Sequence, residues 1–169
     1  MFLTIIACFV VVFLLIRMTV VLTNLLTRPM LSAGVLSYEP KISVLIPARN
    51  EEKNIANILK DLEDQRYKKI EILIYDDDSN DKTFQVVNSF SRESERQIQI
   101  IEGKDLLSGW LGKNHACHQL ALRANGDFFL FLDADVRVGP DLISSSITYL
   151  EKHNLHLLSI FPAQEMITP

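Results

Sequence analysis

The feature that most constrains this chain is an apolar run near its N-terminus. From Phe2 to Leu26 the sequence is mostly Leu, Ile, Val and Phe with small or mildly polar residues between them, and Arg17 is the only charged residue of this run. A helix of this length can cross the hydrocarbon core of a bilayer. The summed insertion free energy of the apolar side chains outweighs the cost of one Arg, whose long side chain can extend toward the interface. We therefore expect residues 1–27 to form a transmembrane anchor.

Two alternatives to an anchor are a cleavable signal peptide and a buried core helix. Met1 to Ile16 is long enough for the apolar part of a signal peptide, but no basic residue precedes it and no convincing small-x-small cleavage site follows closely. Arg17, Arg28 and Lys41 all lie on the C-terminal side, where the positive-inside tendency places the cytoplasm. We therefore expect a single-pass protein of the cell membrane whose remaining residues are cytoplasmic.

Charge and cysteine usage exclude two further classes. The net charge of −4 provides no basic surface for the phosphates of a nucleic acid, so no nucleic-acid partner is expected. Cys8 lies inside the apolar run and Cys117 lies in a helical pattern, which does not indicate a disulfide framework.

After the apolar run the composition changes twice. From Thr27 to Pro40 the composition shifts to Pro, Ser, Gly and Thr, which predicts a linker over residues 28–40. From residue 41 to residue 169, short apolar runs alternate with amphipathic stretches, which is typical of parallel strands joined by helical crossovers. The chain is therefore expected to form one α/β domain with a parallel sheet flanked by helices. The predicted strands are Ile42–Ile46, Ile70–Tyr75, Gln97–Ile101, Asp127–Leu132 and Leu155–Ile160, and the predicted helices lie near Glu51–Asp64, Lys82–Arg92, Lys113–Ala124 and Pro140–Lys152.

Polar motifs follow the first two predicted strands, at the edge of the sheet where α/β proteins bind ligands. The first strand runs into Pro47–Glu52, for which the simplest interpretation is an Asn50 N-cap followed by an acidic first turn. The second runs into Asp76, Asp77 and Asp78, three carboxylates that repel one another although a turn needs only one. They predict hydrogen bonds to a nucleobase or a ribose, and a solvated turn capped by Asn80 or Asp81 is the alternative.

Two carboxylates follow the strand predicted at Asp127–Leu132. Asp133 and Asp135 are separated by one alanine, and leaving both unpaired next to a buried strand is costly. Carboxylate pairs suit a hard divalent cation such as Mg²⁺ or Mn²⁺. Water and substrate phosphate complete the coordination shell of such an ion. An ion at this position would neutralise a diphosphate leaving group. The alternative is an ordinary surface turn.

The segment Ser108–Gln119 precedes and begins a predicted helix. It holds two glycines, the only Trp and Lys113, so backbone N–H groups and this lysine could face an anion, with ordinary helix packing as the alternative. Its spacing differs from that of a Walker A loop. Zinc is disfavoured, because only His115 and His118 share a helix face and no further ligand pair is evident. The chain also contains no serine-hydrolase elbow and no dinucleotide-binding glycine motif after the first strand.

In this order the motifs resemble those of the family-2 glycosyltransferases, which have the GT-A fold. The resemblance covers about Lys41 to Pro162 and rests on the Ile-Pro-Ala-Arg-Asn-Glu-Glu start, the Asp-Asp-x-Ser-x-Asp-x-Thr turn and the Asp-Ala-Asp triplet. It implies a Rossmann-like GT-A sheet. It also implies inverting transfer of a sugar from a nucleotide-diphosphate sugar, for which we expect a UDP-sugar, to a lipid or membrane-associated acceptor.

The resemblance also implies roles for individual residues. Asp77 would contact the nucleobase, and Asp133 and Asp135 would bracket the ribose, the metal and the diphosphate. The stretch Gly109–Lys113 resembles the subset that glycosylates carotenoid or hopanoid-type lipids, the diaponeurosporenoate glycosyltransferases among them. The residues expected to bind the nucleotide sugar are Pro47, Ala48, Arg49, Asn50, Glu51, Asp76, Asp77, Lys113 and Asp133, and those expected to bind the metal are Asp133 and Asp135.

The chain departs from the family pattern at two places. Asp78 and Lys82 stand where the family usually has glycine, which leaves the conformation of that turn open. Family members also usually continue well past this point, so residues 41–169 are expected to be an N-terminal portion. Glu165 is the candidate general base, but the sequence gives no geometry for it. Two other hypotheses are a truncated fragment that binds nucleotide sugar without transferring it, and a membrane scaffold with a structural α/β domain.

Overall fold

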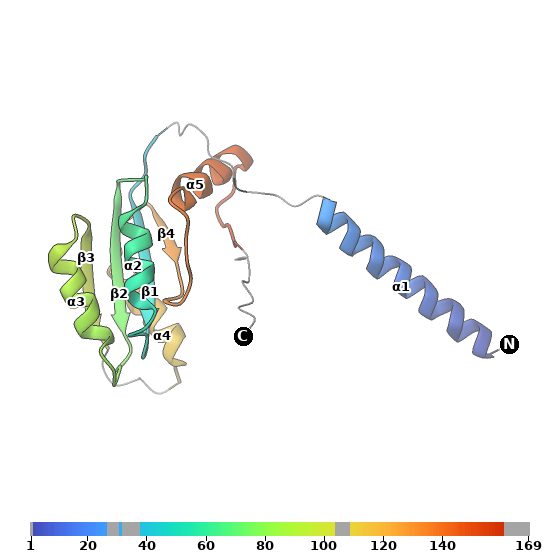
Figure 1. Ribbon diagram of the computed structural model, residues 1–169. Helices are drawn as coiled ribbons and strands as arrows, with labels where there is room; N and C mark the ends of the chain where they lie inside the picture. The colour runs from blue at the N-terminus through green and yellow to red at the C-terminus, as the bar shows by residue number, and fades with distance from the viewer. Residues whose placement is uncertain (1, 27–30, 32–37, 104–108, 161–169) are drawn as a thin grey trace. The chain divides into compact units, whose positions relative to one another are not determined.

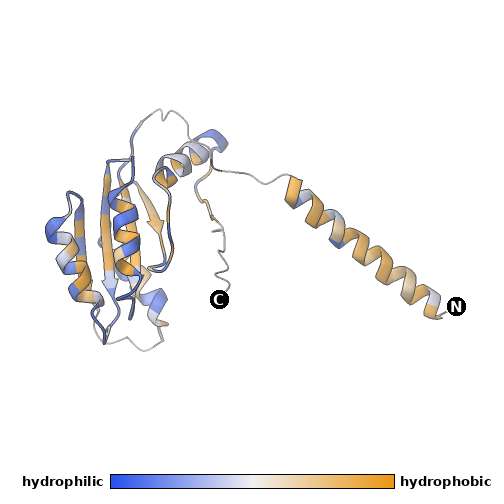
Figure 2. Cartoon of the chain, viewed as in Figure 1, coloured by the Kyte–Doolittle hydropathy of each residue, from blue (hydrophilic) through white to orange (hydrophobic). Residues whose placement is uncertain are grey.

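The computed structural model describes residues 2–26, 31, 38–103 and 109–160, and the chain divides into two units, Met1–Leu31 and Ser32–Pro169. The first unit contains the helix α1 (Phe2–Leu26), none of whose residues is buried. Figure 2 shows its almost continuous apolar surface. The side-chain hydroxyls of Thr19 and Thr23 each donate to the carbonyl four residues earlier, so these polar groups are satisfied within the helix. By length and composition, α1 is long and apolar enough to span a membrane.

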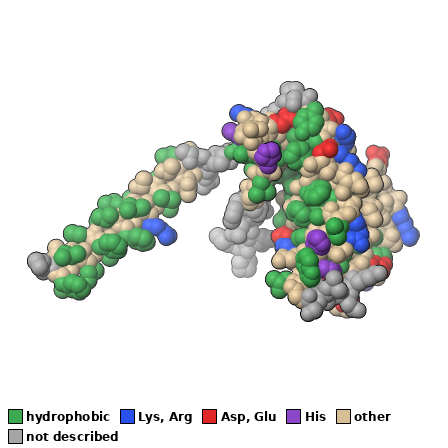
Figure 3. All heavy atoms as spheres, turned by 180° about the vertical axis from the view of Figure 1, so that it is seen from behind, with side chains coloured by type: hydrophobic (Ala, Val, Ile, Leu, Met, Phe, Trp, Pro, Cys, Tyr) green, Lys and Arg blue, Asp and Glu red, His purple; other side chains and the backbone are tan. Residues whose placement is uncertain are grey.

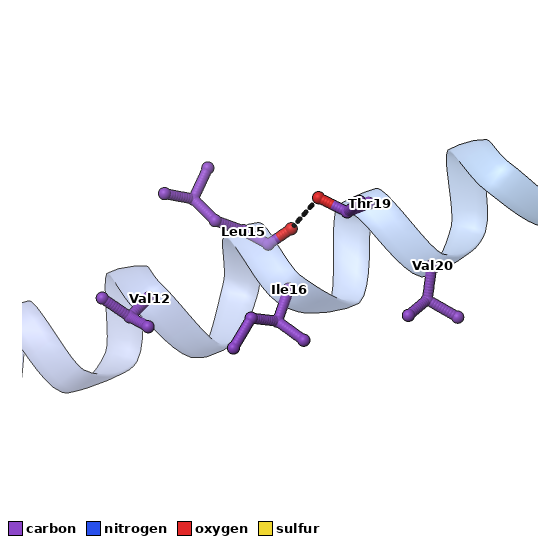
Figure 4. A pocket seen from close by; sticks show the side chains of 5 residues that line it. All are labelled: Val12, Leu15, Ile16, Thr19 and Val20. Atoms are coloured by element: carbon purple, nitrogen blue, oxygen red, sulfur yellow. Dashed lines mark hydrogen bonds between the residues drawn. The ribbon is translucent and has the colours of Figure 1, made fainter.

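A shallow hollow on α1 has no features of a binding site. It is lined by Val12, Leu15, Ile16, Thr19 and Val20, and the one hydroxyl among them bonds the Leu15 carbonyl (Figure 4). A single exposed helix cannot enclose a ligand, and this lining offers only apolar contact. The hollow is therefore part of the apolar surface of the helix.

The second unit is built on a parallel sheet. Its strands are β1 (Ile42–Ala48), β2 (Ile70–Asp76), β3 (Gln97–Glu102) and β4 (Phe128–Phe131), in the order β3-β2-β1-β4 (Figure 1). Ile42 pairs with Ile70 on one side and with Phe128 on the other. Because β1 and β2 lie in the middle of the sheet, both of their faces are covered, which explains why their sequences are apolar without alternation.

Helices cover both faces of this sheet. The helices α2 (Ile55–Glu63), α3 (Thr83–Glu93) and α5 (Leu142–His153) pack against one face, where the even-numbered side chains of β1 and β2 point. The helix α4 (Gly112–Ala121) packs against the other face, over Leu45, Leu73 and Tyr75. In α2 the core-facing stripe has the spacing of an amphipathic helix and consists of Ile55, Ile58, Leu59 and Leu62.

The predicted parallel α/β sheet and the N-terminal apolar helix are confirmed, and two details differ. The helix predicted from Glu51 begins at Ile55, because the N–H groups of Glu51 and Glu52 bind side chains of the neighbouring loop. The segment Leu155–Ile160 is not a strand. Since α5 lies on the same face as α2 and α3, placing this segment parallel to the free edge of β4 would require a left-handed crossover, which proteins avoid.

Of the strands in the described part of the chain, β4 pairs with β1 alone, and its side chains on the α4 face are half exposed. Phe129 and Phe131 have relative exposures of 47% and 48%, because α4 covers β1 and β2 but does not reach them. Figure 3, the view from behind, shows apolar side chains gathered on this surface.

A buried polar cluster joins the amino ends of the strands to the turn before β4. Glu71 is only 2% exposed, and its carboxylate accepts hydrogen bonds from the Lys41 ammonium (2.5 Å), the Ser43 hydroxyl (2.5 Å) and the Asn125 N–H (2.7 Å). The Ser43 Oγ in turn accepts the Gly126 N–H at 2.8 Å. Burial raises the pKa of Glu71, but these three donors outweigh it and hold the pKa below its usual value.

We expect Glu71→Gln to destabilise the domain by about 2 kcal/mol at pH 7, because the amide NH₂ would face the Lys41 ammonium and the charged acceptor would be lost. A carboxylate whose pKa is lowered on folding stabilises the protein above its unfolded pKa, and this contribution is lost as the pH falls through the folded pKa. Urea unfolding from pH 7 down to pH 3 should therefore show the difference between wild type and variant shrinking below about pH 4.5. A difference that stays constant with pH would contradict this role.

Candidate functional site

A pocket of about 380 Å³ opens at the carboxyl ends of the strands. Its walls come from the residues after β1, β2 and β4 and from the first turn of α4, which is where parallel sheets place their ligand sites. Four carboxylates and two cationic side chains line it, so a divalent cation would balance the excess negative charge. The lining residues are Pro47, Ala48, Arg49, Glu51, Asp77, Gly112, Lys113, Ala116, Asp133, Ala134 and Asp135.

The loops after β1 and β2 are joined by reciprocal hydrogen bonds. The Asn50 N–H donates to Ser79 Oγ at 2.9 Å, and the Asn80 N–H donates to Asn50 Oδ1 at 2.8 Å. Further along, the Glu51 N–H donates to Thr83 Oγ1 at 2.8 Å, and Thr83 Oγ1 donates to an Asp81 carboxylate oxygen at 2.5 Å. Backbone N–H groups that would otherwise be unpaired are therefore used to fix the two loops together.

Because of these hydrogen bonds, part of the Asp-Asp-x-Ser-x-Asp-x-Thr turn holds the loops after β1 and β2 in place. Asp76 is 6% exposed and accepts the Ser79 N–H, and Asn50 adopts a left-handed φ of 57° to reach across, so neither lines the pocket and Asn50 does not cap α2. Asp78 also has a left-handed φ, 55°, which explains why glycine suits this position. Neither Asp78 nor Lys82 is among the lining residues.

Asp77 is the one carboxylate of this turn that reaches the pocket. Its backbone N–H donates to the Ala48 carbonyl at 2.9 Å, which fixes it beside the end of β1. Its side chain is 17% exposed and lies 3.5 Å from Arg49 Nη1. Gly112 faces it so closely that a Cβ there would lie 2.9 Å from the nearer Asp77 carboxylate oxygen. The position of the Asp77 carboxylate therefore depends on the absence of a side chain at residue 112.

If the pocket holds the nucleotide that the sequence resemblance implies, Gly112→Ala should weaken nucleotide binding about tenfold while leaving the free energy of unfolding within about 0.5 kcal/mol of wild type. Alanine is favoured over glycine in a helix, which offsets the crowding, but the new methyl group must displace the Asp77 carboxylate. Titration with UDP and urea unfolding of the same preparation separate the two effects. Unchanged UDP affinity would show that Asp77 is not a nucleotide contact.

Asp133 and Asp135 extend from the turn after β4 into the same pocket. The Leu132 N–H donates to the Leu45 carbonyl at 3.1 Å, so this turn is held to β1. Lys113, on the first turn of α4, reaches across and binds Asp133 Oδ1 at 2.6 Å. This hydrogen bond raises the pKa of Lys113, which keeps it an ammonium. Two exposed carboxylates provide the oxygen ligands that Mg²⁺ and Mn²⁺ prefer, and they leave most of the coordination shell to other groups.

The two histidines of α4 are engaged in ring packing. His115 is 5% exposed, and its ring meets Tyr75 and Trp110 edge to face, while Trp110 stacks on His118 with ring centroids 5.0 Å apart. Burial raises the pKa of the Cys117 thiol, so it is not a ready nucleophile. Within the described ranges no three His, Cys, Asp or Glu side chains form a group that could hold a metal.

The structure therefore brings together most of the residues predicted for the nucleotide-sugar and metal sites. Asn50 and Asp76 lie beside the pocket and support its loops, while Glu165 lies outside the described residues. Gly112, Ala116 and Ala134 also line the pocket, although none of them was among the residues expected to bind the nucleotide sugar or the metal. Small residues carry no chemical signal of their own, and only their places at the start of a helix or between two aspartates could have suggested this role.

Comparison with known proteins places this pocket in a family. Residues 43–166 match the family model described as glycosyl transferase family 2. A 4,4'-diaponeurosporenoate glycosyltransferase of Staphylococcus haemolyticus is 34% identical over 130 residues, which is 76% of this chain and 33% of that protein. An enzyme of the same name from Staphylococcus aureus is 32% identical over 138 residues, 80% of this chain and 35% of the relative. The chain thus spans about a third of the length of the curated relatives it matches.

Solved structures show the same fold. A mannosyltransferase from Pyrobaculum calidifontis, in complex with GDP-Man and Mn²⁺, superimposes with a TM-score of 0.63 at 24% identity and covers 74% of this chain and 36% of that one. Residues 1–349 of TarS from S. aureus, in complex with UDP-GlcNAc, give a TM-score of 0.55 at 26% identity and cover 68% of this chain and 32% of theirs. The sheet described above is therefore that of the GT-A glycosyltransferases.

Proposed function

This chain belongs to glycosyl transferase family 2, and from that membership we propose that its pocket binds a nucleotide-diphosphate sugar, with a UDP-sugar as the expected donor. The observation that carries the proposal is the convergence of Asp77, Lys113, Asp133 and Asp135 on one pocket from two strand ends and a helix start. The structure of TarS with UDP-GlcNAc supports a uridine nucleotide, while the mannosyltransferase of the same fold holds GDP-Man.

In this proposal the nucleoside lies at the Asp77 side of the pocket. The Asp77 carboxylate, shielded at 17% exposure and oriented by the Ala48 carbonyl, accepts a hydrogen bond from the nucleobase. Arg49 moves from Asp77 toward the nucleotide, since its side chain is 58% exposed and free to rotate. Pro47 and Glu51 complete this wall.

The diphosphate lies between α4 and the turn after β4. The first N–H groups of α4 and the Lys113 ammonium bind phosphate oxygens, since a helix N-terminus attracts anions. Asp133 and Asp135 would hold Mg²⁺ or Mn²⁺, which neutralises the charge that develops on the leaving diphosphate. The sugar carbon is then attacked from the opposite side by an acceptor hydroxyl, with inversion of configuration.

The acceptor in this proposal is a lipid. The curated relatives are named for a carotenoid acid, and α1 is long and apolar enough to span a membrane. The proposal puts the domain on the cytoplasmic side, because Arg17, Arg28 and Lys41 all lie toward the C-terminal end of the apolar run. An anchored pocket would meet membrane-dissolved acceptors at high effective concentration.

Calorimetric titration of the detergent-solubilised chain tests donor binding. UDP and UDP-glucose are titrated with and without Mn²⁺, and we expect binding of both, strengthened by the ion. Lack of binding to either ligand in the presence of Mn²⁺ would refute the proposal. Transfer from the bound donor to an extracted lipid fraction, compared with transfer to a soluble sugar, tests the acceptor class.

A further inference from the structure

We propose that Lys113 couples the divalent ion to the diphosphate: it neutralises Asp133 while the pocket is empty and exchanges Asp133 for the diphosphate when the donor binds. The inference rests on the proposed function and concerns the order and strength of binding at that same site. Its consequence is that the pocket holds a divalent ion weakly until a diphosphate is present.

Lys113 and Asp133 form an ion pair within the pocket. The Lys113 ammonium lies 2.6 Å from Asp133 Oδ1, within hydrogen-bond distance of an atom that would ligate the ion. A divalent ion that binds alone must either displace this ammonium or accept a positive charge beside it, and both cost free energy.

The protein itself offers few ligands to a divalent ion in this pocket. Asp133 and Asp135 are two exposed carboxylates, and the described residues contain no group of three side chains able to hold a metal. An ion bound only by these two would keep most of its water, and a diphosphate is the group that completes its shell. The protein part of the site is therefore weak even before Lys113 competes for it.

The Lys113 side chain can turn from Asp133 toward a bound diphosphate. Its side chain is 65% exposed, so it can rotate, and its backbone lies on the first turn of α4 within the pocket lining. A diphosphate at this helix start offers the ammonium a new anionic partner when the ion takes Asp133. The diphosphate takes Lys113 away from Asp133, which favours binding of the ion, and the ion takes Asp133 away from Lys113, which favours binding of the diphosphate. This is positive coupling, and the factor by which each ligand strengthens binding of the other must be the same.

The test measures Mn²⁺ binding to the full chain in detergent, by titration followed by electron paramagnetic resonance, alone and with saturating UDP. Lys113→Met keeps the length of the side chain and removes the charge. We expect it to strengthen binding of Mn²⁺ alone about tenfold, because one competing positive charge is removed from the ligand. We also expect the factor by which UDP strengthens Mn²⁺ binding to fall about tenfold or more, and Lys113→Arg to retain much of the coupling.

A matched control separates this exchange from a general loss of positive charge. Lys82→Met removes the same charge from an exposed residue that does not line the pocket, so Mn²⁺ affinity should change less than twofold. Equal or weaker binding of Mn²⁺ alone by Lys113→Met would overturn the inference, even if UDP still bound. Failure of the wild type to bind UDP with Mn²⁺ would instead refute the proposed function, and the inference with it.

Discussion

Asp135→Asn is expected to lower the metal-dependent affinity for UDP about 100-fold, equivalent to about 2.7 kcal/mol. Asp135 and Asp133 both line the pocket from the turn after β4. An amide keeps the shape of the side chain but removes the negative charge on which a hard cation depends. Titration with UDP at saturating Mn²⁺ measures the loss, and titration without Mn²⁺ should give the same weak affinity for variant and wild type.

Asp78→Asn is the matched control for this variant. It makes the same change of charge in an exposed carboxylate that does not line the pocket, and asparagine tolerates the left-handed φ of 55° at this position. UDP affinity with Mn²⁺ should stay within about twofold of wild type, since exposed charges outside the site are screened. Similar losses in both variants would mean that the overall acidity of this surface, and not a metal ligand, controls binding.

Gly126→Ala is expected to destabilise the domain by about 3 kcal/mol. A Cβ at residue 126 would lie 2.5 Å from the Ser43 backbone nitrogen, 2.7 Å from Ser43 Oγ and 2.9 Å from the Lys41 carbonyl oxygen. Two of these atoms belong to the backbone around the start of the central strand β1, which cannot move without breaking its pairs with β2 and β4. The shift would also separate Ser43 from Glu71 in the buried polar cluster.

Thermal unfolding followed by near-ultraviolet circular dichroism measures this loss, and we expect the melting temperature to fall by roughly 6–12 °C. Gly139→Ala is the control, because a Cβ at residue 139 meets no atom within 4 Å. Its stability should remain within about 0.5 kcal/mol of wild type. If Gly126→Ala proves as mild as Gly139→Ala, the turn before β4 is not held as tightly as these contacts indicate.

The position of the pocket was largely predictable because it contains several carboxylates, and carboxylates at the end of a buried strand cost free energy unless a ligand or a hydrogen bond pairs them. Asp133 and Asp135 follow an apolar strand, and the edge at which parallel strands end is fixed by their direction, so their meeting with Asp77 follows from topology. The resemblance to the family implied the roles of the individual residues, which stay predictions. The cross-bonds between the β1 and β2 loops were not predictable, because Asn50, Ser79 and Thr83 are equally common as exposed loop residues and as helix caps.

The sequence by itself determined the apolar helix, the alternation of strands and helices, and the strand ends at which charged residues gather, because hydrophobic periodicity and charge cost are local properties of the chain. Only the tertiary structure decided that Asp76 and Asn50 support the loops while Asp77 enters the pocket, that Lys113 binds Asp133, and that Leu155–Ile160 stays out of the sheet. These outcomes depend on which atoms lie across from one another and on which face a helix packs. Such relations between residues far apart in sequence carry no local signal.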